Sequence, residues 1–431
     1  MNEKLIVKRK FFDSLKRGTG EAYLIARDNP TIDFSEFIIK GALINYAFDG
    51  QSEDSRAEYI YDLVSLSSKK DKIRKTIFQG LANERNDTWN LTHLFDLVKI
   101  YAYHGNLEAK QVIYDRFLHE PIEGSDWVGY SEILEIDGFE GLLYIAEKFG
   151  KWIEKHPDDW QDDSIINHFQ DDNPQINVYQ ELESAAKENR FIKIYLNNLI
   201  RTEESRKNHI RETPSYTDLI DEVLNRTPFF PYKRKMELSD REVSEIAERL
   251  LVEKNKVRLE KLLDVFDCRK FPFDSEFILR LAKQRPDSRN RISEYATSAL
   301  KFLSSDNIRQ FALDKIPKSK RPERYIDILY SNYRSGDYQL LVEMARRFKN
   351  DYIIENLSSS YINIYETNKT PECKEPLEEL YSKMNCGIHR CALIEVLIIN
   401  NVLSDRIKGE IQYDSYLPTR ELFNEKQNVL L

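Results

Sequence analysis

The chain of 431 residues is 41% hydrophobic and 32% charged, a composition that supports a folded core and excludes a disordered polypeptide. Glycine and proline occur only 14 times each, and this scarcity of turn-forming residues favours helices over sheets. No run of about 18 apolar residues exists, so we expect no membrane span, and the apolar run near the basic start is too short for a signal peptide. Four cysteines are too few for a disulfide framework, and we therefore expect a cytoplasmic protein.

Charge is unevenly distributed along the chain, whose formal net charge is −9. Residues 120–190 contain 18 acidic and 5 basic side chains, whereas residues 191–349 contain 33 basic and 25 acidic ones. An acidic zone is therefore followed by a mildly basic one, and we expect the two zones to present different surfaces to a partner.

Pairs of apolar runs with helical spacing recur along the chain, and a short polar turn separates the two runs of each pair. Gly105, Gly138 and Gly336 stand at three of these turns, where glycine can adopt the left-handed conformation that ends one helix before the next begins. The pairs occupy residues 90–117, 130–153, 290–316, 324–348 and 389–423. In the last of them, the first run is apolar on nearly every side and we expect it to be buried.

The pair at residues 290–316 shows the pattern clearly. Its first helix carries an unbroken apolar stripe, formed by Ile292, Tyr295, Ala296, Ala299, Leu300 and Leu303. Residues 304–307 break the stripe and offer side-chain oxygens that can cap a second helix, which ends before Pro317. Phe311 lies on the apolar face of that second helix, so we expect its ring to belong to the core.

One helix pair cannot bury its apolar face alone, so repeated pairs must stack on one another. Where a period is measurable it is about 40 residues, which is typical of paired-helix repeats. We therefore predict an all-α fold, an α-α superhelix or solenoid of stacked antiparallel helix pairs; a helical bundle and an irregular all-α enzyme are the alternatives. The expected divisions are N-terminal repeats at 1–120, a divergent acidic segment with long loops at 121–236 and C-terminal repeats at 237–431, all in one continuous solenoid.

The stretch SSDNIRQFALDKI, residues 304–316, resembles the second helix of a HEAT repeat, and its Asp306 and Arg309 match the acidic and arginine positions of that family. Asp414 and Arg420 match these positions more loosely, and the N-terminal third is similar to bacterial HEAT-like proteins. The resemblance implies a ladder in which the arginine of one repeat reaches the aspartate of its neighbour. A carboxylate at a helix N-terminus interacts favourably with the helix dipole, and an arginine guanidinium can form two hydrogen bonds with a carboxylate of a neighbouring helix.

Two groups of residues belong to types that bind metals. Cys386, His389 and Cys391 lie within six residues, but they lack the paired Cys-x-x-Cys spacing of structural zinc sites. The acidic run at residues 158–172 lacks the alternation and the glycine of a calcium loop. We therefore expect neither group to bind a metal, and the sequence predicts no cofactor.

The sequence contains none of the phosphate-binding, dinucleotide-binding, zinc-protease or nucleophile-elbow motifs, which favours a protein without enzymatic activity. A Ser-His-Asp site stays open as an alternative, because its residues need only meet in the folded chain. Asp54 and Arg56 lie close together before a predicted helix, where a catalytic pair or a ligand clamp is one interpretation. We expect instead that Ser52 or Asp54 caps that helix.

Two sets of side chains are candidates for contacts with a partner. Trp127 and Trp160 fall in polar stretches, and exposed aromatic side chains often mark binding surfaces. Lys318, Lys320 and Arg321 form a basic cluster beyond a predicted helix. Further basic clusters stand at residues 233–235 and 346–347.

We predict a scaffold whose HEAT-like solenoid holds a protein partner on its inner face. The alternative is a nucleic-acid-binding HEAT-like protein of the DNA glycosylase type, which would need a basic inner face. The acidic zone argues against that alternative.

Overall fold

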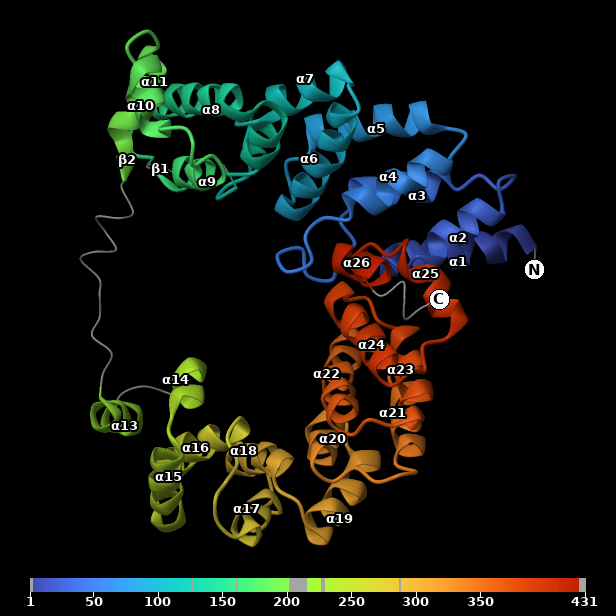
Figure 1. Cartoon of the computed structure of the whole chain (residues 1–431), viewed down its shortest axis with the longest axis vertical. Helices are drawn as coiled ribbons and strands as arrows, with labels where there is room; N and C mark the ends of the chain where they lie inside the picture. Colours follow the sequence, from blue (N-terminus) through green and yellow to red (C-terminus); the bar gives the residue numbers. More distant parts are fainter. Residues whose placement is uncertain are drawn as a thin grey trace. The chain divides into compact units, whose positions relative to one another are not determined.

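The computed structural model describes residues 3–125, 127–159, 161–200, 215–225, 229–286 and 288–425. These residues form 25 α-helices, several of which continue into a short 3₁₀ turn, and about 70% of the described chain is helical (Figure 1). The prediction of an all-α fold is therefore confirmed.

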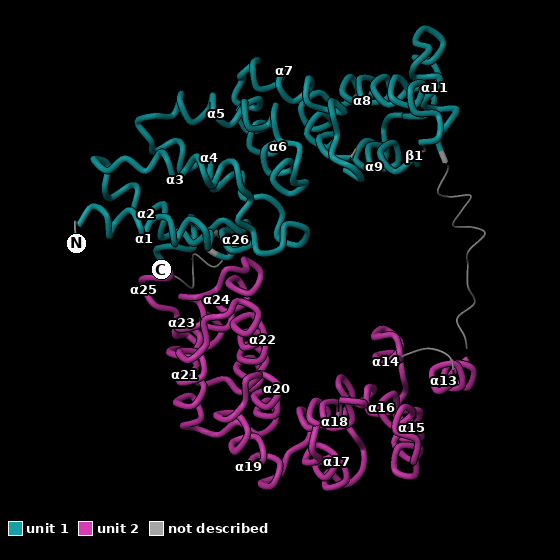
Figure 2. The backbone as a smooth tube through the Cα atoms, turned by 180° about the vertical axis from the view of Figure 1, so that it is seen from behind, with its two compact units in different colours: residues 1–211, 409–431 teal, residues 212–408 magenta. Residues whose placement is uncertain are grey.

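Contacts between residues group the chain into two compact units, which Figure 2 distinguishes by colour. Unit 1 comprises residues 1–211 and 409–431, and unit 2 comprises residues 212–408. Unit 1 thus combines an N-terminal and a C-terminal segment, whereas unit 2 is one continuous segment. The division into residues 1–120, 121–236 and 237–431 stays a prediction, because it concerns composition and repeat type rather than contacts.

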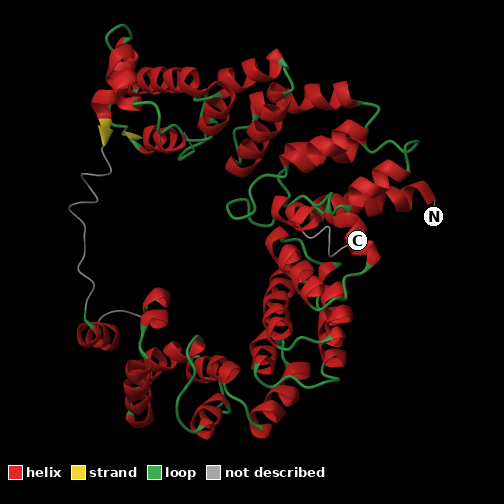
Figure 3. Cartoon of the chain, in the orientation of Figure 1, coloured by secondary structure: helices red, strands yellow, loops and turns green. Residues whose placement is uncertain are grey.

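Unit 1 is built from consecutive short helices whose apolar stripes meet in a shared core. Its helices are α1 (Glu3–Arg17), α2 (Glu21–Asp28), α3 (Ser35–Leu43), α4 (Ala57–Leu66), α5 (Lys70–Asn83), α6 (Thr88–Tyr103), α7 (Leu107–Arg116), α8 (Tyr130–Lys155), α9 (Ser164–Asp172), α10 (Val178–Ala185), α11 (Arg190–Asn198) and α26 (Leu417–Glu425). The strands within the described ranges are β1 (Gln161–Asp162) and β2 (Leu199–Ile200), which pair in parallel over two residues each (Figure 3). The sheet is thus too small to organise the unit.

The pair α6 and α7 shows how the sequence forms these helices. The side chains of Asp87 and Asn106 cap the two helices by accepting hydrogen bonds from backbone N–H groups of the first turns. Between the helices, Gly105 has a φ of 80°, so the predicted left-handed turn is confirmed. At Gly138, whose φ is 56°, the expected break between helices is a kink inside α8.

The C-terminal segment of unit 1 packs against its N-terminal helices. The backbone N–H of Ser415 donates a hydrogen bond to the carbonyl oxygen of Gly18, 2.8 Å away. The backbones also approach so closely that a Cβ added to Gly20 would lie 2.0 Å from the carbonyl oxygen of Glu410. Position 20 therefore requires a glycine, because the close approach of the two segments leaves no room for a side chain.

Unit 2 consists of further short helices in continuous order. They are α13 (Tyr216–Asn225), α14 (Tyr232–Glu237), α15 (Asp240–Val252), α16 (Lys256–Leu263), α17 (Ser275–Ala282), α18 (Ile292–Ala299), α19 (Asp306–Lys315), α20 (Glu323–Ile326), α21 (Tyr338–Arg347), α22 (Asp351–Thr367), α23 (Lys374–Tyr381) and α24 (Gly387–Ile399), after which α25 (Asp405–Ile411) crosses the boundary between the units. Towards the end of unit 2, helices pack on their next-but-one neighbours, α21 on α23 and α22 on α24 (Figure 1, orange to red).

The helix pair predicted at residues 290–316 is α18 and α19. Every residue of the predicted apolar stripe is buried except Tyr295, which is half-buried. Ser305 caps α19 by accepting a hydrogen bond from a backbone N–H of the first turn. Phe311 is 6% exposed, and its ring packs edge-on against that of Tyr325 with centroids 5.9 Å apart. The predicted core position of Phe311 is confirmed.

We predict that Gly20→Ala destabilises the protein by about 1–3 kcal/mol, because the new Cβ would overlap with the carbonyl oxygen of Glu410 unless the backbone moved. Gly409→Ala is a matched control: no atom lies within 4 Å of the Cβ that it adds, and alanine suits a helix better than glycine. Chemical denaturation of both variants measures the difference. Equal free energies of unfolding for the two variants would contradict the close contact at position 20.

Phe311→Ala should lower the free energy of unfolding by about 3–5 kcal/mol, because it leaves a cavity where an aromatic ring packs. Leu251→Ala, at a position that is 42% exposed in the same unit, should cost less than about 0.5 kcal/mol. Denaturation curves check both values. If the two substitutions had the same small effect, the ring of Phe311 would not be part of the core.

Candidate functional site

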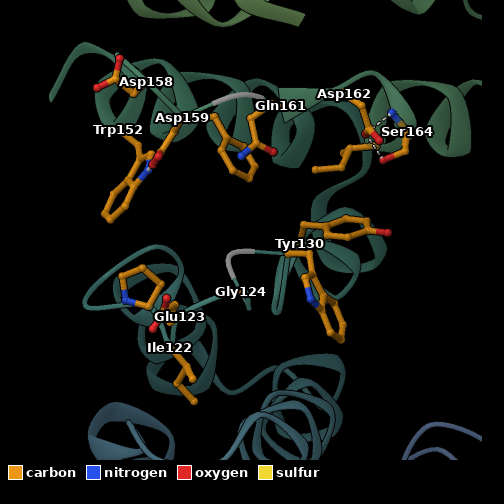
Figure 4. A pocket seen from close by; sticks show the side chains of 14 residues that line it. Ile122, Glu123, Gly124, Tyr130, Trp152, Asp158, Asp159, Gln161, Asp162 and Ser164 are labelled. Carbon is orange, nitrogen blue, oxygen red and sulfur yellow. Dashed lines mark hydrogen bonds between the residues drawn. The ribbon is translucent and has the colours of Figure 1, made fainter. Parts of the chain in front are cut away.

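A hollow of about 870 Å³ lies in unit 1 between the loop that precedes α8 and the segment that joins α8 to α9. We call it the first hollow, and Figure 4 shows the side chains around it. Four carboxylates and four aromatic rings contribute to its wall: Glu123, Asp158, Asp159, Asp162, Trp127, Tyr130, Phe149 and Trp152. The wall therefore combines negative charge with flat apolar surfaces.

Hydrogen bonds hold two of these carboxylates in place. The indole N–H of Trp152 donates to Asp159 over 2.7 Å, and the Trp152 ring stacks on His156 with centroids 4.2 Å apart. The backbone N–H of Ser164 donates to Asp162 over 3.0 Å at the start of α9 (Figure 4). Because hydrogen bonds already orient these side chains, less conformational entropy is lost when a ligand binds.

Trp127 is shared between the first hollow and a second one of about 630 Å³. Its side chain is 43% exposed, as the sequence predicts, whereas Trp160 lies outside the described residues. A second tryptophan, five carboxylates and one lysine contribute to the wall of the second hollow: Trp89, Asp54, Glu58, Asp96, Glu132, Glu135 and Lys99.

The backbone next to Trp127 is firmly anchored. Val128 is buried, and Gly129, the residue before α8, has a φ of 101°. A Cβ added to Gly129 would lie 2.6 Å from the ring of Phe95, so both the conformation and the space require glycine. Trp127 is therefore an exposed aromatic side chain directly before two closely packed residues, and exposed aromatic side chains often mark binding surfaces.

Negative charge dominates the second hollow. Lys99 pairs with Asp96 over 3.2 Å and with Glu135 over 2.9 Å. Burial lowers the pKa of Lys99, but the neighbouring carboxylates outweigh this effect and raise it above its ordinary value. Burial, together with the charge of Asp96, raises the pKa of Glu132 to about 8. A further positive charge in this hollow would be favourable, because it would stabilise the ionised form of Glu132 and of its neighbours.

A third hollow of about 320 Å³ adjoins the second, because Ser131 and Glu135 line both. The first hollow has four carboxylates, the second has five others, and the third adds Asp172, against a single lysine. We call the walls of these three hollows the acidic surface of unit 1. Carboxylates form charge-assisted hydrogen bonds with guanidinium and ammonium groups, and indole rings attract the same cations. The acidic surface is thus suited to binding positively charged side chains.

One expectation about this region is wrong. The sequence predicts that Ser52 or Asp54 caps the next helix, but α4 begins after Arg56 without a side-chain cap. Ser52 instead donates a hydrogen bond to Asp49 over 2.7 Å. Asp54 has a φ of 61° and lines the second hollow, so a residue expected to cap a helix belongs to the candidate site.

The predicted basic cluster begins with Lys318, the last residue of the 3₁₀ turn that follows α19 in unit 2. Lys318 and Lys320 are exposed, whereas Arg321 pairs with Glu323 over 2.8 Å and lies above the ring of Tyr352. Two lysines of this cluster are thus accessible to a partner, and the arginine is already engaged within the protein.

Carboxylates neutralise much of the other two basic clusters. Lys235 is buried between Asp264, 2.9 Å away, and Asp267, 3.2 Å away. Arg346 pairs with Glu375 over 2.8 Å. These cations contribute little to the positive potential around the protein, because a neighbouring negative charge compensates each of them.

Arg309 connects its helix pair to the following one. Two of its nitrogens each lie 2.6 Å from a carboxylate oxygen of Asp337, and these hydrogen bonds raise the pKa of Arg309. In the opposite direction, Arg334 of the following pair forms an ion pair with Asp306. The four side chains thus bridge two consecutive helix pairs twice.

Arg420 makes a different contact from the one that the resemblance implies. Its Nε donates a hydrogen bond to the backbone carbonyl oxygen of Asp414 over 2.5 Å. Its ion pair is with Asp62 on α4, over 3.0 Å. Arg420 therefore fastens the C-terminal segment to the N-terminal helices of unit 1.

No family model matches the chain, and no curated protein shows a significant match to it. Among the helices in the described ranges, none has both the length and the apolar character that crossing a membrane requires.

We predict that Glu132→Gln stabilises the protein at pH 8 by on the order of 4 kcal/mol and has little effect near pH 4. The folded state raises the pKa of Glu132 to about 8 from an unfolded value near 4.5, so folding favours the protonated carboxyl. The resulting penalty is absent below the unfolded pKa and grows as the pH rises towards 8, and glutamine removes it. Melting temperatures across this range test the prediction, with Glu140→Gln on the exposed side of α8 as control. A constant difference at every pH would contradict it.

Proposed function

We propose that the chain is a scaffold that binds a protein partner, and that its helix pairs form a HEAT-like solenoid. The packing of α21 on α23 and of α22 on α24 supports a stack of successive pairs. The reciprocal bridges made by Arg309 and Arg334 also support it, because they join consecutive pairs as the resemblance to HEAT repeats implies. A stack of this kind offers long continuous surfaces to a partner.

The acidic surface of unit 1 is the observation that carries the proposed function. We infer that it takes an extended basic segment of the partner. A lysine or arginine side chain can place its charged end against the carboxylates of one hollow and its aliphatic stem along an indole ring. Because Trp127 belongs to two hollows, it would contact two cationic side chains of the same segment.

Lys318 and Lys320 offer a second contact region, in unit 2. Both are exposed, so they can meet an acidic region of the partner. The proposed scaffold therefore has an acidic contact region in one unit and a basic one in the other, in line with the charge asymmetry of the sequence. The placement of both regions on the inner face of a solenoid is part of the proposal.

Nucleic-acid binding of the DNA glycosylase type is the second candidate function, and the charge arrangement disfavours it. Phosphate binding requires accessible cations. Lys235 and Arg346 are engaged with carboxylates, and the walls of the three hollows would repel phosphate groups. Accessible Lys318 and Lys320 are the observation in its favour.

We also propose a cytoplasmic location. All four cysteines belong to the described part of the chain, and none of them forms a disulfide. Cysteines in this state are typical of proteins from reducing compartments.

Trp127→Ala should weaken the binding of a fluorescently labelled octa-arginine peptide about tenfold, because it removes an aromatic contact shared by two hollows. Fluorescence anisotropy measures the affinity, and binding should weaken further as salt is added. Tyr232→Ala is the matched control: Tyr232 is an exposed aromatic residue of unit 2, and its removal should leave the affinity unchanged.

Three results would contradict the proposed function. An octa-glutamate peptide that binds as tightly as octa-arginine would show that the carboxylates do not select the ligand. Equal losses in Trp127→Ala and Tyr232→Ala would place the peptide elsewhere. Tighter binding of duplex DNA than of octa-arginine at physiological salt would favour the second candidate function.

A further inference from the structure

Three side chains of metal-binding types meet in unit 2, far from the acidic surface in the sequence. Glu355 lies on α22, Cys386 is the residue that precedes α24, and His389 lies in the first turn of α24. One donor atom from each lies within 4.8 Å of the other two. Since α22 packs on α24, the group spans the contact between two helices.

The two distances from His389 to the other donor atoms are close to those of a metal site. His389 Nδ1 lies 3.2 Å from Cys386 Sγ and 3.6 Å from Glu355 Oε1. In a tetrahedral zinc site, bonds of about 2.3 Å to sulfur and about 2.0–2.1 Å to nitrogen and oxygen place the donor atoms about 3.4–3.6 Å apart. The three side chains can therefore hold an ion with small adjustments of their rotamers.

Ser359 contacts His389 and can select the tautomer of its ring. Its hydroxyl donates a hydrogen bond to the backbone carbonyl oxygen of Glu355 over 3.2 Å, and its Oγ lies 2.9 Å from His389 Nε2. A hydroxyl has one hydrogen, so with that hydrogen on the carbonyl, Oγ accepts from Nε2–H. Nδ1 then has a lone pair that faces the sulfur and the carboxylate. In most metal-binding histidines, the ring nitrogen that does not bind the metal donates a hydrogen bond that orients the ring.

We propose that Glu355, Cys386 and His389 bind one divalent transition-metal ion of the zinc class. In the tautomer with Nδ1 unprotonated, its lone pair and the carboxylate oxygen 3.6 Å away are both electron-rich, and a cation between them removes their repulsion. A proton would bridge two of the three donors, whereas a metal ion binds all three at once. The ionised carboxylate and the thiolate together balance the two charges of the ion, and the proton of the thiol is released on binding. A water molecule or another donor completes four-coordination.

The solvent exposure of the three side chains would allow a bound ion to exchange with solvent. Cys386 is 4% exposed, while the side chains of His389 and Glu355 are 21% and 28% exposed. The sulfur is thus protected, and the other two ligands can be reached from solvent. The bound ion would fasten α22 to α24, and it would stabilise unit 2 because the unfolded chain lacks the assembled site.

The inference changes the expectation drawn from the sequence. That expectation concerned Cys386, His389 and Cys391, whose spacing does not predict a zinc site. The structure replaces Cys391 by Glu355, which precedes the other ligands by about 30 residues in the sequence, well outside the usual spacing of ligand pairs. The packing of α22 on α24 brings Glu355 to the other two ligands, and no local sequence pattern predicts this contact.

Cobalt titration of the full-length protein tests the site, after treatment with a chelator and under reducing conditions. We expect one cobalt ion per chain, with absorption bands from a thiolate–cobalt bond and from four-coordination, and we expect zinc to displace the cobalt. Cys386→Ser should abolish the thiolate band. Glu355→Gln should retain the fold and weaken binding at least about tenfold. Cys268→Ser removes a thiol elsewhere in unit 2 and should behave like the unmodified protein.

The melting temperature provides a second readout. Zinc should raise it in the unmodified protein and in Cys268→Ser, and it should have a smaller effect in Glu355→Gln. Two results would overturn the proposal: a protein that gains neither the absorption bands nor stability with metal, or a thiolate band that persists in Cys386→Ser. In the first case a protonated His389 bridging Glu355 and Ser359 would account for the cluster.

Discussion

The apolar stripe of each helix pair is removed from water only when another part of the chain packs on it, and this constraint governs both units. In α24, Leu393, Ile394, Val396 and Leu397 are all fully buried, which α22 and α23 make possible by covering the helix. Each such side chain contributes about 1.5–3 kcal/mol on burial. Most of the described helices are short, so most of their stability comes from these contacts rather than from the helices alone.

The same constraint explains why unit 1 combines an N-terminal and a C-terminal segment of the chain. Its first helices would expose a face if nothing packed beside them, and the C-terminal segment supplies the cover. The rings of Tyr23 and Tyr413 stack with centroids 4.1 Å apart, and the contact at Gly20 and Glu410 brings the two backbones together. Polar contacts such as Arg309–Asp337 then favour one particular neighbour, because a buried charge without its partner is costly.

Local patterns in the sequence predicted the features that depend on neighbouring residues. The burial of Phe311, the cap at Ser305 and the positive φ of Gly105 and Gly336 all follow from the spacing and type of nearby residues. Contacts between distant segments were not predictable in this way. Asp54 reaches the candidate site although its position before α4 indicated a cap, because its left-handed conformation is set by the surrounding loop.

The candidate sites were the least predictable part of the structure, because they too are formed by contacts between distant segments. The second hollow collects carboxylates from the loop before α4 and from α4, α6 and α8, so that no single segment reveals it. The proposed metal site likewise needs α22 beside α24. The exposure of Trp127 could be predicted because an aromatic residue in a polar stretch is itself a local signal. Its position between two hollows is a property of the fold.

Hydrogen–deuterium exchange with and without a bound octa-arginine peptide tests the central claim, that unit 1 binds a basic segment through its acidic surface. Protection reports where the peptide lies without any substitution in the protein. The account predicts slower exchange in the backbone around Trp127, Trp89 and Trp152, and unchanged exchange around Lys318. Protection confined to unit 2, or none in unit 1, would contradict it.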